Sequence, residues 1–187
     1  RNPNETYVAA NGGYIYFMSN PSAAVTVLTD GSVSTQNLTD IRGAGRTIVA
    51  VGASNAVLVS NNDGRTWTLV TGPAVGVTLN TVEVINDDIW YIGANNGKSF
   101  YTVNGGDTWV EMTPDSSITV VNRIRFVDDI VGYMVVTLSA SGRLYRTADN
   151  GYSWHHDGGV GASCHYDSDY WQKALSQVSP QSVLQEF

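Results

Sequence analysis

The sequence has little positive charge, a single cysteine and no long apolar run. Its 187 residues include 10 Lys and Arg against 17 Asp and Glu, a formal net charge of −7. Such a surface repels a phosphate backbone more than it attracts one, so nucleic acid is not expected as a partner. No run of 18 apolar residues is present, so no membrane-spanning helix is predicted. Cys164 has no second cysteine to pair with, which excludes an internal disulfide.

The residues that are abundant indicate an all-β globular chain. Hydrophobic residues make up 42% and charged residues only 14% of the sequence, a balance typical of a folded domain. The 19 glycines, together with many Val, Thr and Asn residues, favour strands joined by tight turns. Residues that favour helices are sparse before the last twenty positions.

One short motif occurs three times, as "SNNDGRTW" (60–67), "TVNGGDTW" (102–109) and "TADNGYSW" (147–154), at steps of 42 and 45 residues. Each copy has a hydroxyl residue first, Asn or Asp third, Gly fifth, Thr or Ser seventh and Trp eighth. We call each copy a turn motif. The fifteen matched residues are Ser60, Asn62, Gly64, Thr66 and Trp67; Thr102, Asn104, Gly106, Thr108 and Trp109; and Thr147, Asp149, Gly151, Ser153 and Trp154.

The chemistry of the turn motif suits a hairpin turn. A short Asn or Asp side chain accepts hydrogen bonds from backbone N–H groups, and Gly supplies a positive φ. The Trp begins the next strand, and burying its ring between sheets stabilises the fold by roughly 2–3 kcal/mol. We therefore expect the motif to be structural, with Trp67, Trp109 and Trp154 in the core and Trp90 and Trp171 available as exposed contact residues.

The segments around the turn motif repeat as well. Three strand-like segments precede each copy and a fourth begins at its Trp. An earlier, degenerate copy is expected near the N-terminus, with Ser19 standing 41 residues before Ser60 but without the Gly and Trp. Radial four-stranded units of this length are the blades of a β-propeller. The predicted domain covers 1–158, with blades at about 5–30, 33–72, 76–113 and 118–158.

The repeated motif resembles the Asp box, or bacterial neuraminidase repeat. That repeat occurs in sialidases, xyloglucan-hydrolysing glycosidases, sortilin-type receptors and the photosystem II stability and assembly factor group, to which the chain is closest in style. The resemblance covers about residues 5–158 and implies a propeller, while these families differ in chemistry. Two acidic positions of the box are Asn62 and Asn104 here, so no argument can depend on their carboxylates.

The innermost strand of each blade is the expected place for a ligand, because it borders the central channel. Aligning these strands on Asn37, Asn80 and Asn122 predicts a core face and an opposite, charged face. The core face would hold Thr39, Ile41, Val82, Val84, Ile124 and Phe126, and the opposite face Asp40, Glu83, Arg123 and Arg125, with Asp40, Glu83 and Arg125 at equivalent positions.

Three roles are open for this charged face. Glu83 and Arg125 can form an ion pair between blades, Arg123 or Arg125 can contact a ligand at the channel mouth, or Asp40 and Glu83 can act as a glycosidase pair. The first is favoured, and no residue is assigned as catalytic.

No metal or cofactor is predicted. The acidic pairs in "NDD" (86–88) and "VDD" (127–129) are favoured as polar turns over calcium ligands. The tract "HHDGG" with Cys164 and His165 has the residue types of a zinc site but no familiar spacing. Residues 159–187 form a predicted tail with a short amphipathic helix at about 168–178, capped by Ser168 or Asp169.

Four units use almost the whole chain, whereas Asp-box propellers generally have six or more blades. A small closed propeller, the ordered part of a larger one and an arc completed by a partner all remain open. The sequence begins at Arg1 with no initiator Met and no signal-like segment. We therefore expect either that a preceding segment was removed or that these residues are part of a longer polypeptide.

We interpret the chain as a non-catalytic interaction or structural module that presents loops to a protein or a glycan within a homo- or hetero-oligomeric assembly. An extracellular or virion-surface decoration component is one such case. The alternative is a sialidase-like or xyloglucanase-like glycoside hydrolase domain.

Overall fold

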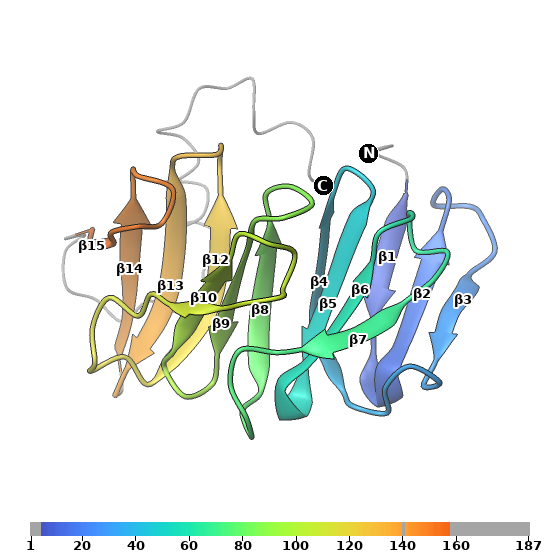
Figure 1. Ribbon diagram of the computed structural model, residues 1–187, viewed down its shortest axis with the longest axis horizontal. Coiled ribbons are helices and arrows are strands. Elements are labelled where there is room, and N and C mark those ends of the chain that lie inside the picture. Colours follow the sequence, from blue (N-terminus) through green and yellow to red (C-terminus); the bar gives the residue numbers. More distant parts are fainter. Residues whose placement is uncertain (1–4, 140, 158–187) are drawn as a thin grey trace.

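The computed structural model describes residues 5–139 and 141–157. This part is all-β, with 15 strands and two short 3-10 turns, η1 (Asn11–Gly13) and η2 (Ala53–Asn55) (Figure 1). The tail helix expected at 168–178 lies outside the described residues. No helix in the described part has the length and hydropathy to cross a bilayer.

The strands form four antiparallel sheets in which neighbours in sequence are neighbours in space. Sheet I contains β1 (Thr6–Ala9), β2 (Tyr14–Met18) and β3 (Thr26–Asp30). Sheet II contains β4 (Leu38–Ala44), β5 (Thr47–Gly52), β6 (Ala56–Ser60) and β7 (Thr68–Thr71). Sheet III contains β8 (Leu79–Val84), β9 (Trp90–Ala94), β10 (Ser99–Thr102) and β11 (Val110–Glu111). Sheet IV contains β12 (Val120–Phe126), β13 (Gly132–Leu138), β14 (Ser141–Thr147) and β15 (His155–His156).

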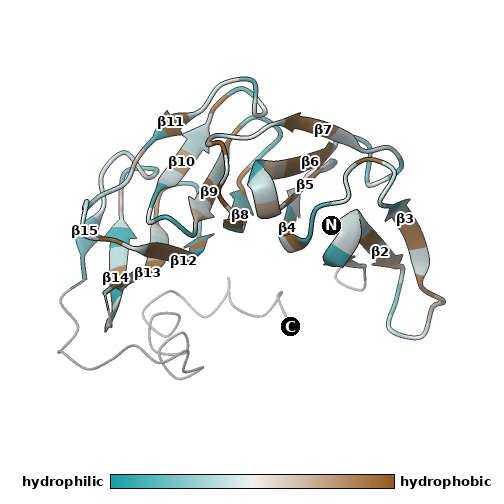
Figure 2. Ribbon diagram, turned by 90° about the horizontal axis from the view of Figure 1, so that it is seen from below, coloured by the Kyte–Doolittle hydropathy of each residue, from teal (hydrophilic) through white to brown (hydrophobic). Residues whose placement is uncertain are grey.

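The sheets stand face to face in an arc, with β4, β8 and β12 on its inner side and β7, β11 and β15 on its outer side (Figure 2). Apolar side chains fill the space between each pair of sheets in three clusters. This radial packing is that of β-propeller blades and confirms the predicted fold class. Sheets I and IV lie at opposite ends of the arc, so the described sheets alone do not close a ring.

The three turn motifs share one hydrogen-bond pattern. The first hydroxyl accepts from the backbone N–H of the glycine, at 2.9 Å in Ser60 and Thr147 and 3.0 Å in Thr102. The side-chain oxygen of the third residue accepts from the N–H of the seventh, at 2.9–3.0 Å. The glycines have φ of 78°, 87° and 79°, a region that costs other residues energy. The amide oxygens of Asn62 and Asn104 therefore accept the same hydrogen bond as the carboxylate of Asp149.

Only Trp67 and Trp154 occupy matching sites. Each is 8% exposed and donates its Nε1–H to the carbonyl of the motif glycine, at 3.0 and 3.1 Å. Trp109 is half-buried and donates instead to Thr71, at 3.1 Å. Its glycine, Gly106, is flanked by both the Trp109 ring and the ring of Trp90, which is 1% exposed. The expectation that Trp90 is an exposed contact residue is wrong, because its ring fills the core between sheets II and III.

The first unit differs from the others in register and strand number. Met18 pairs with Thr6 as Ser60 pairs with Ile48, so Met18, and not Ser19, takes the place of the motif hydroxyl. By the same pairing β1 corresponds to β5, the second strand of sheet II. Sheet I therefore has no described counterpart of the inner strands β4, β8 and β12.

The face of sheet I that points away from sheet II is apolar. Val8 and Tyr14 on this face are 41% and 37% exposed. Their counterparts in sheet II, Ala50 and Ala56, are 0% and 4% exposed because sheet I covers them. No described sheet covers the equivalent face of sheet I (Figure 2).

Asp149 gives the third turn motif a dependence on acid that the other two lack. Hydrogen bonds from the Ser153 hydroxyl and backbone, then from Thr147, lower the pKa of Asp149 from 3.8 to about 2. A carboxylate with a depressed pKa stabilises the fold above its unfolded pKa, and this stabilisation is lost as the pH falls through the folded value. Asp149→Asn is expected to fold normally, because Asn62 and Asn104 support the same turn.

This dependence on acid can be measured by thermal unfolding between about pH 5 and pH 2, a range that includes the ordinary and the folded pKa of Asp149. The midpoint of the wild type should fall more steeply below pH 3.8 than that of Asp149→Asn. Parallel curves for the two proteins would contradict it.

Candidate functional site

The charged residues of the inner strands lie at two positions along the strands, two residues apart, which we call levels, and not at the single set of equivalent positions expected. A bulge interrupts pairing near the start of each inner strand, between Leu38 and Asp40, Leu79 and Thr81, and Val121 and Arg123. The pairing beyond the bulges aligns Asp40 with Thr81 and Arg123, and Arg42 with Glu83 and Arg125.

The prediction that Asp40, Glu83 and Arg125 occupy equivalent positions is therefore wrong. Asp40 lies two residues before the position that aligns with Glu83 and Arg125, although all three side chains belong to one network. The predicted core face also fails at Thr39, which is exposed. Thr39 lies in the bulge of β4, and its hydroxyl donates to the carbonyls of Val51, at 3.1 Å, and Leu79.

Asp40 is the centre of the network. Its side chain is 8% exposed, and Oδ2 accepts from Arg123 Nη1 at 3.2 Å and Arg125 Nη2 at 3.3 Å. The same oxygen accepts from Thr81 Oγ1 at 3.0 Å and from the Val82 N–H at 3.1 Å. Asp40 thus connects sheets II, III and IV through one carboxylate.

Glu83 and Arg125 form the ion pair expected between neighbouring blades. Arg125 Nη1 lies 3.2 Å from Glu83 Oε2, and the two side chains are 16% and 13% exposed. Glu83 Oε1 also accepts from the Phe126 N–H at 3.0 Å. Burial and then the nearby Arg42 lower the pKa of Arg125, while Glu83 and Asp40 oppose that shift. Glu83 and Arg125 thus each make hydrogen bonds besides their ion pair, which a buried ion pair needs to offset the loss of water.

Two arginines at this surface remain accessible. The Arg123 side chain is 42% exposed although one of its nitrogens bonds Asp40. Arg42 is exposed and forms no ion pair with any described residue. Guanidinium groups bind carboxylates through paired N–H donors. This inner surface is thus suited to hold an anionic group, and Arg42 is the residue that the sequence alignment missed.

The other predicted sites are turns or fall outside the described part. Asn86 Oδ1 accepts from the N–H groups of Asp88 and Ile89, and Asp128 Oδ1 from those of Ile130 and Val131. The segments 86–88 and 127–129 are accordingly Asx-type turns. Across residues 5–139 and 141–157, no three His, Cys, Asp or Glu side chains cluster as metal ligands. Cys164 and His165 lie outside the described residues.

Comparisons with known proteins identify the fold. No protein-family model and no curated protein matches the chain. YCF48 from Cyanidioschyzon merolae has a TM-score of 0.60 at 18% identity, over 86% of this chain and 59% of that one. A structure of YCF48 bound to a D1 peptide has a TM-score of 0.55 at 20% identity, over 64% of this chain and 40% of that one. The GH74 enzyme of Niastella koreensis has a TM-score of 0.66 at 20% identity, over 82% of this chain and 28% of that one.

These likenesses show that the chain has the fold of a β-propeller. At identities of 20% or less, they carry no information about chemistry, because one fold supports many functions. The chain spans 59% of the first of these proteins and 28% of the last.

Proposed function

We propose that the chain is a non-catalytic protein-interaction module whose inner surface binds an acidic segment of a partner. One observation carries the proposal. Asp40 and Glu83 are engaged by Arg125 and by backbone donors, so the charge left accessible beside them is that of Arg42 and Arg123. On a chain with a net charge of −7, a local cationic surface selects for carboxylates by electrostatic complementarity.

The fold supports this proposal. YCF48, which is similar in fold, has been solved bound to a D1 peptide, so a protein of this fold can bind a peptide. The uncovered apolar face of sheet I supports a place within a larger assembly. No described feature is specific to a virion component, so the proposal names only the interaction.

The hydrolase alternative requires two carboxylates that exchange protons with a sugar and a water. Against this role, Asp40 and Glu83 are only 8% and 13% exposed, and their oxygens already accept hydrogen bonds from arginine and backbone donors. Reporter glycosides incubated with the protein should therefore release no product above the rate without protein. Turnover that is lost in Asp40→Ala or Glu83→Ala would refute the non-catalytic assignment.

Binding can be tested with a fluorescein-labelled peptide of six alternating Glu and Gly residues, followed by anisotropy. Arg42→Gln with Arg123→Gln should weaken binding about tenfold or more, because charge-assisted hydrogen bonds contribute roughly 1.5–3 kcal/mol each. Arg46→Gln is the matched control, since Arg46 is exposed, lies in the turn after β4 and already pairs with Asp63 of the first turn motif. Equal affinity of the double variant and the wild type would refute the site. Binding only to acidic glycans would refute the choice of a protein partner.

A further inference from the structure

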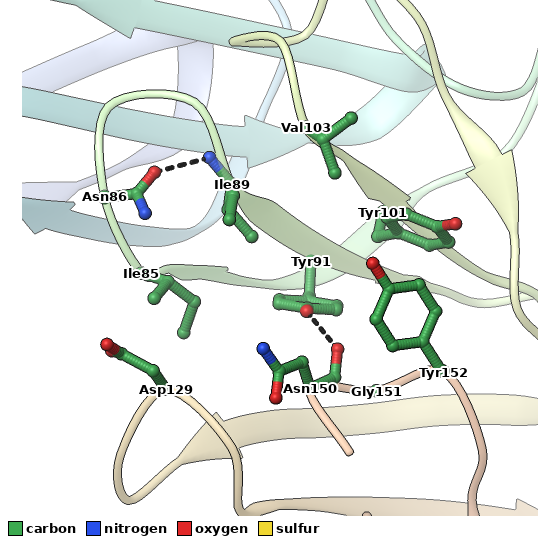
Figure 3. Close-up of a pocket in the computed structure, with 10 residues that line it drawn as sticks. All are labelled: Ile85, Asn86, Ile89, Tyr91, Tyr101, Val103, Asp129, Asn150, Gly151 and Tyr152. Atoms are coloured by element: carbon green, nitrogen blue, oxygen red, sulfur yellow. Dashed lines mark hydrogen bonds between the residues drawn. The ribbon is translucent and has the colours of Figure 1, made fainter.

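A separate pocket of about 170 Å3 opens between sheets III and IV, beside the third turn motif (Figure 3). Tyr91, Tyr101 and Tyr152 form its aromatic wall, and Ile85, Ile89 and Val103 supply apolar surface. This volume is below the roughly 300–1,000 Å3 of sites for drug-sized ligands. The pocket is therefore the size of one side chain and not of a whole small molecule.

The tyrosine rings are set at fixed angles to one another. The Tyr91 and Tyr101 rings lie 6.2 Å apart, and Tyr152 meets Tyr101 edge-on at 6.3 Å and 76°. The Tyr91 hydroxyl donates to the Asn150 carbonyl (Figure 3). Burial, followed by the nearby Tyr152, raises the pKa of Tyr91 to about 12, so this bond persists at neutral pH. Tyr152 is 75% exposed at the rim, where its ring is available to a ligand.

The equivalent interface between sheets II and III has a hydrogen bond across it that the interface between sheets III and IV lacks among the described residues. There, the Thr47 hydroxyl donates to Asp87 Oδ1 at 2.6 Å. Asp129 stands three residues before β13 as Asp87 stands three before β9, and Ile89 takes the place of Thr47. Isoleucine has no donor, and Asp129 makes no hydrogen bond or ion pair with a described residue. The pocket thus has a carboxylate whose partner has been lost.

The charge of the pocket is negative. Its ten lining residues include Asp129 and no Lys, Arg or His. Aromatic faces attract cations through their quadrupole, and a nearby carboxylate adds a direct charge attraction. We propose that this pocket binds a cationic side chain, lysine or arginine, of a protein partner.

This site is independent of the inner surface described above. The proposed partner segment there is acidic, whereas the pocket selects a basic group on different strands. Either site can fail its test without affecting the other.

The test is a two-dimensional NMR titration of the whole chain with the peptides Ac-Gly-Lys-Gly-NH2 and Ac-Gly-Arg-Gly-NH2. Shifts should concentrate at Tyr91, Tyr101 and Tyr152, with a dissociation constant in the millimolar range expected for a single side chain. Tyr152→Ala and Asp129→Asn should each weaken binding about fivefold, the loss expected for one cation–π contact or one exposed charge pair. Tyr152→Phe, which keeps the ring, should bind like the wild type.

The controls separate charge from shape. Asp107→Asn removes the same charge from the preceding turn motif and should leave the affinity unchanged. The norleucine peptide Ac-Gly-Nle-Gly-NH2 should not bind. Equal binding of the norleucine peptide, or no shift at the three tyrosines up to about 10 mM peptide, would overturn the proposal. Because Tyr152 and Asp129 are both exposed, these variants are expected to fold.

Discussion

Replacing Arg125 with Met is expected to lower the free energy of unfolding by about 3 kcal/mol, since breaking a buried ion pair leaves its partners uncompensated. Arg125 faces two carboxylates, those of Asp40 and Glu83, which are 8% and 13% exposed. Its guanidinium also donates to the carbonyls of Val82, at 3.0 Å, and Ile124, at 2.6 Å. Urea denaturation monitored by tryptophan fluorescence measures the loss.

The exposed pair of Lys98 and Glu111 provides the control. Its two atoms are only 2.6 Å apart, but the side chains are 46% and 45% exposed. Lys98→Met should cost less than about 1 kcal/mol, because water already solvates both charges. In the Arg125→Met background, Glu83→Gln should be less destabilising than in the wild type, because it removes a carboxylate that has lost its cation. Equal costs for Arg125→Met and Lys98→Met would contradict this account of the network.

The turn motif could be predicted from sequence because its interactions are local. The side-chain hydrogen bonds of Ser60 and Asn62 all close within five positions of the chain, so residue identity and spacing are sufficient to define them. The number of units and the propeller fold follow from the repetition of this turn. The ion pair of Glu83 and Arg125 also followed, because it needs only the correct face of two neighbouring inner strands.

The level of each charge along the inner strands could not be predicted. The bulges lie at equivalent positions of the three inner strands, with Thr39, Asn80 and Asn122 as the extra residues, so they do not shift one strand against another. The sequence alignment takes Asn37 as the counterpart of Asn80, whereas that counterpart is Thr39. An alignment on Asn37 and Asn80 assumes a step of 43 residues, whereas the pairing of Asp40 and Thr81 shows a step of 41. Arg42 was overlooked for this reason. The tyrosine pocket was missed because its lining residues come from two sheets and are distant in sequence.

Trp90→Ala is expected to destabilise the protein by about 4 kcal/mol, within the range for deleting a buried aromatic side chain. Trp90 is 1% exposed, packs between sheets II and III, and donates its Nε1–H to the Asn86 carbonyl at 3.1 Å. Trp109, which the motif places in the core, is half-buried beside it with ring centroids 6.3 Å apart.

Trp109→Ala should therefore cost only about 1–2 kcal/mol, in proportion to the smaller apolar area that it removes from water. Trp67→Ala serves as the control, because Trp67 keeps the buried site that the motif predicts and should cost about as much as Trp90→Ala. Urea denaturation of the three variants gives the order. The motif alone predicts that Trp109 matters as much as Trp67 and more than Trp90, so the ranking decides between the repeated sequence and the packing that Trp90 imposes on it.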